Sequence, residues 1–143
     1  MKKTIRFLIT GVGGQGTILA SDIDEAMTAL TAQNAALAGV QHCLHIKTAP
    51  VSAFSPGLAG GTLVCNPPYG ERLLDQKAAR ELYKIMGQQF RRRDGFSYGI
   101  ITPDEEFEKN FGRRADKHRK LYNGMLKCQL FLYEDPAFHS KKK

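Results

Sequence analysis

The run Thr62-Leu63-Val64-Cys65 constrains the fold more than any other feature of this 143-residue chain. It is short and apolar, and it ends at Asn66-Pro67-Pro68-Tyr69-Gly70, where the prolines cannot continue a strand. An apolar run of this length between turn residues predicts a strand in the buried middle of a parallel sheet, because such strands are covered on both faces. Parallel strands are usually joined by helical crossovers.

Strand and helix periodicities alternate along the rest of the chain. The first helix is predicted to begin at an N-cap, Asp22, with Glu25 three positions later, and to stop at Gly39. This alternation predicts an α/β sandwich with a mixed sheet. We expect strands over residues 4–10, 42–48, 62–65 and 96–102, helices over residues 23–37, 74–90 and 104–111, and a closing hairpin of residues 121–122 and 125–133 around the turn Asn123-Gly124.

Positive charge is concentrated in the second half of the chain. Lys and Arg number 21 against 14 Asp and Glu, a net charge of +7, of which residues 1–70 carry +1 and residues 71–143 carry +6. Such a half attracts a polyanion such as RNA, although a solvated basic surface explains the same charge. The candidate phosphate contacts, which an ordinary solvated loop would also explain, are Arg113, Arg114, Lys117, Arg119 and Lys120.

Several classes of protein are disfavoured by what the chain lacks. It contains no run of about 18 apolar residues and no signal-peptide pattern after Met1, so we expect a cytoplasmic protein with no membrane segment. The three cysteines, odd in number and widely spaced, are expected to be reduced and mostly buried. Neither they nor the four histidines have the spacing of metal ligands, so we expect no metal. The sequence leaves the oligomeric state open.

The motif Asn66-Pro67-Pro68-Tyr69 suggests methylation of an exocyclic amine on a nucleobase. The Asn66 side-chain oxygen and the Pro67 carbonyl could each accept one amine N–H, which favours the charge that develops on nitrogen during transfer. The two prolines stiffen the turn, and Tyr69 offers a flat face for an extruded base. A common turn whose aromatic residue packs on the core is the alternative explanation for the same residues.

The segment Asn66 to Leu73 resembles motif IV of the bacterial 23S ribosomal RNA guanine-N2 methyltransferases, THUMP-containing class I enzymes that use S-adenosylmethionine. The resemblance covers about residues 21–135 and implies a Rossmann-like class I methyltransferase sandwich with a C-terminal antiparallel hairpin. It implies that Asp22, at the end of the second strand, binds the cofactor ribose, and that residues 66–69 hold the guanine of 23S RNA. Four more segments resemble the same family in the same order, namely residues 21–24, 34–40, 82–87 and 119–124.

The N-terminal βαβ unit of such a fold is predicted to be incomplete. A βαβ unit takes about 30 residues, whereas only Thr17 to Ser21 separate Gly16 from Asp22, too few for a helix and a strand. In addition, no Asp or Glu lies between Glu25 and Glu71 to accept a hydrogen bond from the cofactor adenine. We therefore expect weakened binding of S-adenosylmethionine and reduced activity.

The glycine run before this interval is a candidate cofactor loop, with Gly11, Gly13 and Gly16 as its binding residues. Residues 9–21 also resemble the opening of the small subunit of indolepyruvate or 2-oxoacid:ferredoxin oxidoreductases. We expect a glycine-loop segment of different origin over residues 1–21, a truncated methyltransferase-like domain over residues 22–135, and a basic tail over residues 136–143.

Three functions are therefore considered. The first is an S-adenosylmethionine-dependent methyltransferase that modifies the N2 amine of guanine in ribosomal RNA. The second is a non-catalytic remnant that binds RNA through its basic half. The third, supported by the glycine run alone, is a fragment of a small oxidoreductase subunit.

Overall fold

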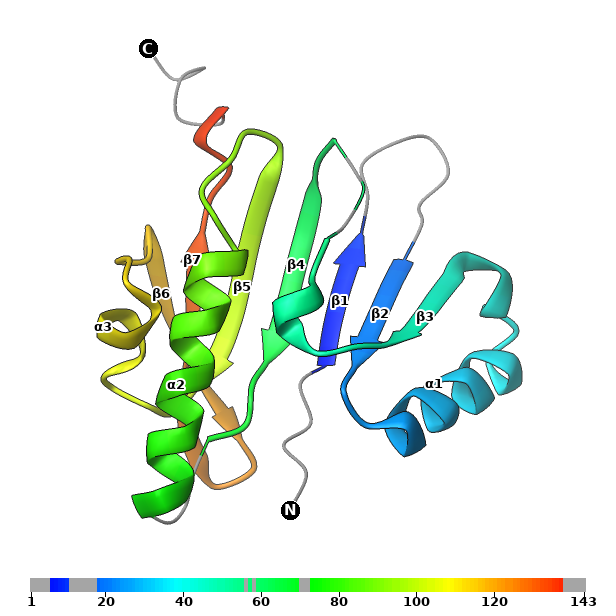
Figure 1. The fold of residues 1–143 in the computed structure, drawn as a ribbon, viewed down its shortest axis with the longest axis horizontal. Helices are drawn as coiled ribbons and strands as arrows, with labels where there is room; N and C mark the ends of the chain where they lie inside the picture. Colours follow the sequence, from blue (N-terminus) through cyan, green and yellow to red (C-terminus); the bar gives the residue numbers. More distant parts are fainter. Residues whose placement is uncertain (1–5, 11–17, 56, 58, 70–72, 138–143) are drawn as a thin grey trace.

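The computed structural model describes residues 6–10, 18–55, 57, 59–69 and 73–137 (Figure 1). Within these residues the strands are β1 (Arg6–Thr10), β2 (Ile18–Asp22), β3 (Leu44–Thr48), β4 (Gly61–Asn66), β5 (Phe96–Thr102), β6 (Lys117–Asn123) and β7 (Leu126–Tyr133). The helices are α1 (Glu25–Leu37), α2 (Leu73–Gln89) and α3 (Phe107–Phe111), with 3-10 turns η1 (Gln41–Cys43) and η2 (Val51–Ala53).

The strands form one sheet in the order β3-β2-β1-β4-β5-β7-β6. This is the Rossmann order 3-2-1-4-5-6 with β7 inserted between β5 and β6. β7 is antiparallel to both of these neighbours, and β6 and β7 form the hairpin around Asn123-Gly124. The predicted fold class, a Rossmann-like α/β sandwich that ends in an antiparallel hairpin, is confirmed.

β1 runs antiparallel to both of its neighbours, β2 and β4, and its arrow points opposite to that of β4 in Figure 1. In a complete βαβ unit a crossover helix returns the chain to the starting edge, so that both strands point the same way. Here only residues 11–17 connect β1 to β2, and a connection this short joins antiparallel neighbours. The N-terminal unit is incomplete, as predicted, but the interval before Asp22 holds a strand, β2, that the sequence pattern does not predict.

The helix after β2 begins later than predicted. Its N-cap is Asp24, whose side chain accepts a hydrogen bond from the Ala26 N–H at 3.0 Å, and not Asp22. Asp22 is the last residue of β2, and its Oδ1 atom accepts the N–H of Asp24 at 2.9 Å. Gly39, at a φ of 70°, follows the last turn of α1 as predicted.

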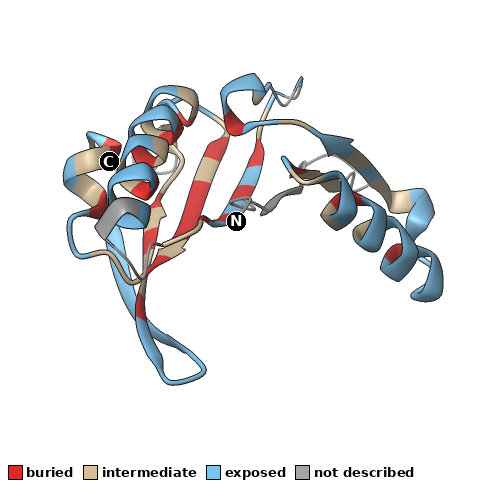
Figure 2. Ribbon diagram, turned by 60° about the horizontal axis from the view of Figure 1, so that its bottom comes forward, coloured by how far each residue is buried: buried red, intermediate tan, exposed pale blue. Residues whose placement is uncertain are grey.

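The two faces of β4 differ in burial, contrary to the prediction of a strand covered on both sides. Leu63 and Cys65 are buried against the helices α2 and α3 and the turn η2, whereas Val64 on the other face is 41% exposed. On that other face α1 packs over β2 and β3, where the hydroxyl groups of Thr28 and Thr48 are 2.7 Å apart. The side of α1 away from the strands is exposed, and no described helix covers β4 there (Figure 2).

Aromatic rings fill the core between the sheet and the helices α2 and α3. Tyr83 meets Phe107 edge to face with ring centroids 5.0 Å apart, and Phe107 lies 4.7 Å from Phe131 of β7. The two helices approach closely because residue 87 is glycine, since a Cβ atom there would overlap the carbonyl oxygen of Phe111. The packed half of the molecule is therefore the half that contains β4, β5 and β7.

Cys65 and Cys128 are buried, Cys43 is half-buried, and all three are free thiols. Burial raises the pKa of the Cys65 thiol well above its usual value. None of the helices in the described parts of the chain is long and apolar enough to cross a membrane. The described residues also contain no group of three or more His, Cys, Asp or Glu side chains placed to hold a metal ion.

Replacement of two neighbouring residues of β4 tests the one-sided burial. Leu63→Ala, at a fully buried position, is expected to lower the free energy of unfolding by about 2–5 kcal/mol, because it leaves a cavity. Val64→Ala, on the open face, is expected to lower it by less than about 1 kcal/mol. Urea denaturation followed by circular dichroism measures both, and equal losses would contradict an open face at β4.

Candidate functional site

The carboxyl ends of the five parallel strands lie along one edge of the sheet. Ligands of Rossmann-like sheets bind outside this edge, at the point where the strand order reverses, which here is at β1 and β4. β1 contributes its amino end to this edge, because Arg6 is the register partner of Asn66. All five strands end on a polar residue, in the order Asp22, Thr48, Asn66, Thr102 and Asn123.

Asp22 and Asn66 face the same side of the sheet. Phe7 of β1 pairs with both Ser21 and Cys65, so the next residues, Asp22 and Asn66, share the opposite face. One strand lies between them, which sets their backbones about 10 Å apart at the usual strand spacing. Asp22 is buried, whereas Asn66 is exposed. Carboxylate and amide acceptors thus flank the candidate site.

The predicted glycine residues Gly11, Gly13 and Gly16 lie outside the described residues. The strand residues on either side of them, Thr10 and Ile18, pair with each other at the edge of the sheet opposite to Asp22. Ile18 and Asp22 are four positions apart in β2, about 13 Å at the usual rise. In a Rossmann unit the glycine turn follows β1 at the carboxyl edge. The reversal of β1 removes the carboxyl end of that strand from the candidate site.

A side chain of α2 anchors the turn Asn66-Pro67-Pro68-Tyr69 through a hydrogen bond. The Tyr83 hydroxyl lies 3.3 Å from the Pro68 carbonyl oxygen and 3.0 Å from the Thr102 Oγ1 atom. A carbonyl only accepts, so Tyr83 donates its single hydrogen to Pro68 and accepts the hydrogen of Thr102. Tyr83 and Thr102 are both fully buried, which makes these bonds costly to break.

The same chain of hydrogen bonds continues into the turn after β5. The Thr102 Oγ1 atom accepts the N–H of Asp104 at 3.2 Å, and the Asp104 carboxylate binds Arg80 of α2 at 3.2 Å. The Arg80 guanidinium also lies 2.9 Å from Glu106. The turns at the ends of β4 and β5 are therefore linked through α2. Sequence reasoning missed Tyr83 and Thr102, for which the available signal is a hydroxyl at an otherwise apolar helix or strand position.

A cavity of about 560 Å³ opens beside Tyr69. The tip of the β6–β7 hairpin reaches the same place, because the Asn123 side-chain amide donates to the Tyr69 hydroxyl at 3.3 Å. The lining of the cavity thus combines the aromatic ring of Tyr69, from the predicted base-binding motif, with polar and acidic groups. The other residues that line it are Gln76, Arg80, Pro103, Asp104, Glu105, Glu106 and Leu126.

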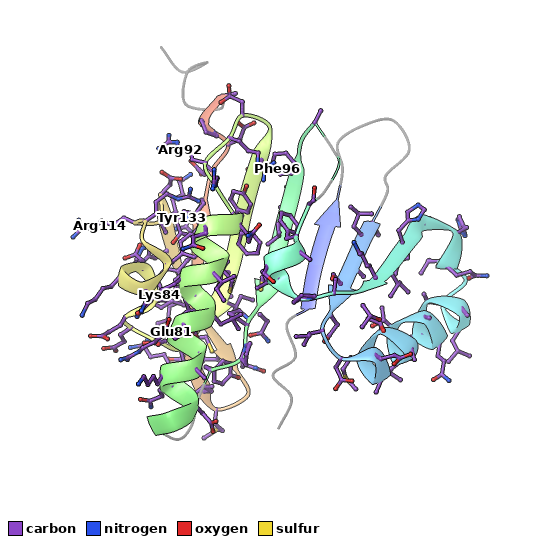
Figure 3. All side chains as sticks on the ribbon, viewed as in Figure 1. Glu81, Lys84, Arg92, Phe96, Arg114 and Tyr133 are labelled. Atoms are coloured by element: carbon purple, nitrogen blue, oxygen red, sulfur yellow. The ribbon has the colours of Figure 1, made fainter. Side chains whose placement is uncertain are left out.

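Three of the five cations predicted to contact RNA lie at the open end of the hairpin, away from its Asn123-Gly124 turn. The half-buried Arg113 guanidinium packs 4.6 Å from the ring of Tyr133, and burial lowers its pKa. Lys117 forms an ion pair with Glu134. Arg114 is exposed and points away from the molecule (Figure 3).

The other two predicted cations, Arg119 and Lys120, are exposed on β6 nearer the candidate site. Lys117 and Asn123 are the first and last of the seven residues of β6, six steps or about 20 Å apart at the usual rise, so β6 carries the chain from one edge of the sheet to the other. The Nζ atom of Lys120 lies 5.5 Å from the centre of the Tyr122 ring. The structure therefore separates the five predicted residues, and it brings Lys120 closest to the hairpin tip.

The Rossmann strand order, the inserted β7 and the motif at the end of β4 define a Rossmann-like methyltransferase domain. The chain belongs to the UPF0020 family, the RMKL-like methyltransferase domain, whose model matches residues 3–131. That match includes β1 and β2, which lie in the same sheet as the later strands. A different origin for residues 1–21 and their resemblance to oxidoreductase subunits stay predictions.

Two curated relatives illustrate the family. The chain is 42% identical over 127 residues to the Bacillus subtilis protein named "Putative RNA methyltransferase YpsC", covering 89% of this chain and 33% of that protein. It is 38% identical over 114 residues to the ribosomal RNA large subunit methyltransferase K/L of Shewanella amazonensis, covering 79% of this chain and 16% of that protein. The chain thus spans a third or less of these relatives.

Two solved structures have the same fold. A possible methylase from Clostridium difficile 630 aligns with a TM-score of 0.79 and 42% identity, covering 84% of this chain and 32% of that one. SMU.472, solved in complex with SAH, aligns with a TM-score of 0.80 and 41% identity, covering 85% of this chain and 32% of that one.

Removal of the Tyr83 hydroxyl tests its hold on the turn. Tyr83→Phe is expected to lower the free energy of unfolding by about 1–3 kcal/mol, because it leaves the buried hydrogen-bonding groups of Pro68 and Thr102 without their Tyr83 partner. Burial raises the pKa of Tyr83 from 10.0 to about 12, so the folded state holds this proton more tightly than the unfolded chain does. The contribution of this pKa shift to the free energy of unfolding is therefore fully present below pH 10, and it is lost as the pH rises from 10 to 12.

Urea denaturation between pH 8 and pH 12 measures this effect, and the variant should lose less stability than the wild type above pH 10. Tyr122→Phe, at an exposed position, is the matched control and should behave like the wild type. An identical decline in wild type and Tyr83→Phe would contradict the assigned role.

Proposed function

We propose that this chain carries the target-base part of an RNA N-methyltransferase site, and that it methylates the exocyclic N2 amine of guanine with S-adenosylmethionine as donor. The observation that carries this proposal is the Asn66-Pro67-Pro68-Tyr69 turn. It lies at the carboxyl end of β4 beside a cavity of about 560 Å³, and Tyr83 and Thr102 brace it. A braced turn keeps its acceptors oriented without paying for reorganisation during the reaction.

Asn66 and Pro67 provide the chemistry of this turn in our proposal. The side-chain oxygen of Asn66 and the main-chain oxygen of Pro67 accept the two N–H groups of the amine. Both acceptors favour the positive charge that grows on nitrogen as it takes the methyl group, after which the nitrogen loses a proton to solvent. Tyr69 stacks on the extruded base, and the cavity beside it receives the base.

Asp22 is the residue whose chemistry fits the cofactor. A buried carboxylate at the end of β2 suits the hydroxyl groups of a ribose, the role that such acids have in Rossmann sheets. When bound, S-adenosylmethionine supplies an electrophilic methyl group on a sulfonium. The fit is partial, because the strand residues on either side of the glycine run lie at the opposite edge and no acid follows β3. We expect weak cofactor binding through Asp22, and the role of Gly11, Gly13 and Gly16, which lie outside the described residues, stays a prediction.

RNA is the proposed substrate, and 23S ribosomal RNA in particular. The names of the relatives, which include ribosomal RNA large subunit methyltransferases, support RNA as the substrate class. The net charge of +6 in residues 71–143 supports a polyanionic partner. Arg114, Arg119 and Lys120 are exposed and available to phosphates, whereas we assign Arg113 and Lys117 to the structure of the hairpin base.

Isothermal titration with S-adenosylmethionine and S-adenosylhomocysteine tests the cofactor part of this proposal. We expect weak binding of both, and Asp22→Asn should weaken it about tenfold or more, since it removes charged hydrogen bonds to ribose. Asp24→Asn, which keeps an N-cap residue and changes the net charge equally, is the matched control. The absence of heat at millimolar cofactor would exclude the enzymatic function.

The reversed β1 favours a second candidate function, a non-catalytic protein that binds RNA. It moves the carboxyl end of β1, which a Rossmann sheet uses for the cofactor, away from Asp22 and Asn66. RNA binding without any cofactor binding in the titration above would support this second function and exclude the first.

Asn66→Ala separates the base-holding role from cofactor binding. We expect methyl transfer to guanine-containing RNA to fall by about 100-fold or more, because one of two acceptors for the amine is lost. The cofactor affinity should stay nearly unchanged, and Val64→Ala on the same strand face should retain activity. Transfer of a radioactive methyl group to RNA measures the rate, and loss of both activities together would contradict the role of Asn66.

A further inference from the structure

The tip of the β6–β7 hairpin exposes an aromatic ring between two lysines. Tyr122 is 63% exposed, and the Nζ atom of Lys120 lies 5.5 Å from the centre of its ring. Lys127 is the cross-strand register partner of Tyr122, so it occupies the same face of the hairpin, with Cβ atoms about 4.5–5.5 Å apart. One planar ring and two cations therefore share a single exposed face.

The charged side chains at the base of the hairpin are engaged with the rest of the molecule, whereas the two lysines beside Tyr122 at the tip are not. His118 binds Glu108 at 3.0 Å, Lys117 is paired with Glu134, and the Arg113 guanidinium packs on Tyr133. No described acidic side chain pairs with Lys120 or Lys127. Residues 117–133 contain four Lys and Arg residues and no Asp or Glu.

The hairpin tip is also connected to the candidate site. The side-chain amide of Asn123, next to Tyr122 in the chain, donates to the Tyr69 hydroxyl, and Leu126 lines the cavity beside Tyr69. Asn123 and Leu126 are register partners and share one face of the hairpin, while Tyr122 and Lys127 share the other. The tip thus presents one face to the candidate site and the other to solvent.

We infer that Tyr122 is a stacking platform for a base next to the target nucleotide in single-stranded RNA, with Lys120 and Lys127 on the adjoining phosphates. The inference rests on the proposed function, because Tyr69 is taken to hold the target base. Two tyrosine rings on either side of Asn123 would then engage successive parts of one strand. An exposed ring stacks on any base, while cations beside it neutralise the backbone. An acidic protein segment would need the cations but not the ring.

Fluorescence anisotropy with a labelled 12-nucleotide single-stranded RNA tests this inference on the full chain. Tyr122→Ala is expected to raise the Kd about 5- to 100-fold, the range for loss of one base–aromatic stack, whereas Tyr122→Phe should bind like the wild type. Lys120→Ala and Lys127→Ala should each weaken binding and lower the slope of log Kd against log salt by about 0.7.

The controls are an exposed apolar residue and an exposed lysine far from the hairpin tip. Leu37→Ala on α1, where Leu37 is 87% exposed, and Lys47→Ala on β3, the strand at the opposite end of the sheet from β6, should leave the Kd unchanged. Circular dichroism at each protein concentration confirms that all variants are folded. An unchanged Kd for Tyr122→Ala would overturn the inference, and so would equal affinity for duplex RNA, whose stacked bases cannot reach the ring.

The proposed function is tested separately by methyl transfer to the same RNA. Wild-type binding that depends on Tyr122, without methyl transfer, would retain the stacking platform and exclude the enzymatic function. Methyl transfer with an unchanged KM for RNA in Tyr122→Ala would exclude the platform and retain the enzyme. Polyglutamate offers negative charge but no base to stack on the ring. If it competed with RNA equally well for the wild type and for Tyr122→Ala, charge alone would be recognised, which would also overturn the inference.

Discussion

The seven-residue connection between β1 and β2 decides the direction of β1 and, through it, which strand ends meet at each edge of the sheet. Seven residues cannot cross the sheet through a helix, so the two strands pair antiparallel and β1 runs against every neighbour. The strand order of a Rossmann sheet survives this reversal, because backbone pairing is available to a strand in either direction. The reversal instead places the amino end of β1 at the carboxyl edge of the parallel strands, and its carboxyl end at the opposite edge.

Two further features concern the core and the site. No described helix covers the face of β4 that carries Val64, and the packed core lies on the other side of the sheet, against α2 and α3. At the carboxyl edge, Asp22 and Asn66 keep their places, whereas Thr10 lies at the opposite edge. The turn at the end of β4 is thus in place at the carboxyl edge, whereas the carboxyl end of β1 is not.

Local signals predicted most of the elements. The strand over residues 96–102, the hairpin turn Asn123-Gly124 and the stop at Gly39 follow from side-chain alternation and backbone conformational preference, which neighbouring residues decide. The local pattern did not predict β2, since this strand has only five residues and its conformation depends on pairing with β1 and β3. The N-cap shifted from Asp22 to Asp24 because β2 extends through Asp22, which an isolated helix signal cannot anticipate.

Contiguous residues and composition were enough to predict the Rossmann-like class, the Asn66-Pro67-Pro68-Tyr69 motif and the basic second half. Three features come from the fold alone: β1 is reversed, Tyr83 and Thr102 brace the motif, and Asn123 brings the hairpin tip to Tyr69. The physical reason is that hydrogen bonds between residues 15 to 54 positions apart depend on strand direction and helix placement, which no local pattern encodes.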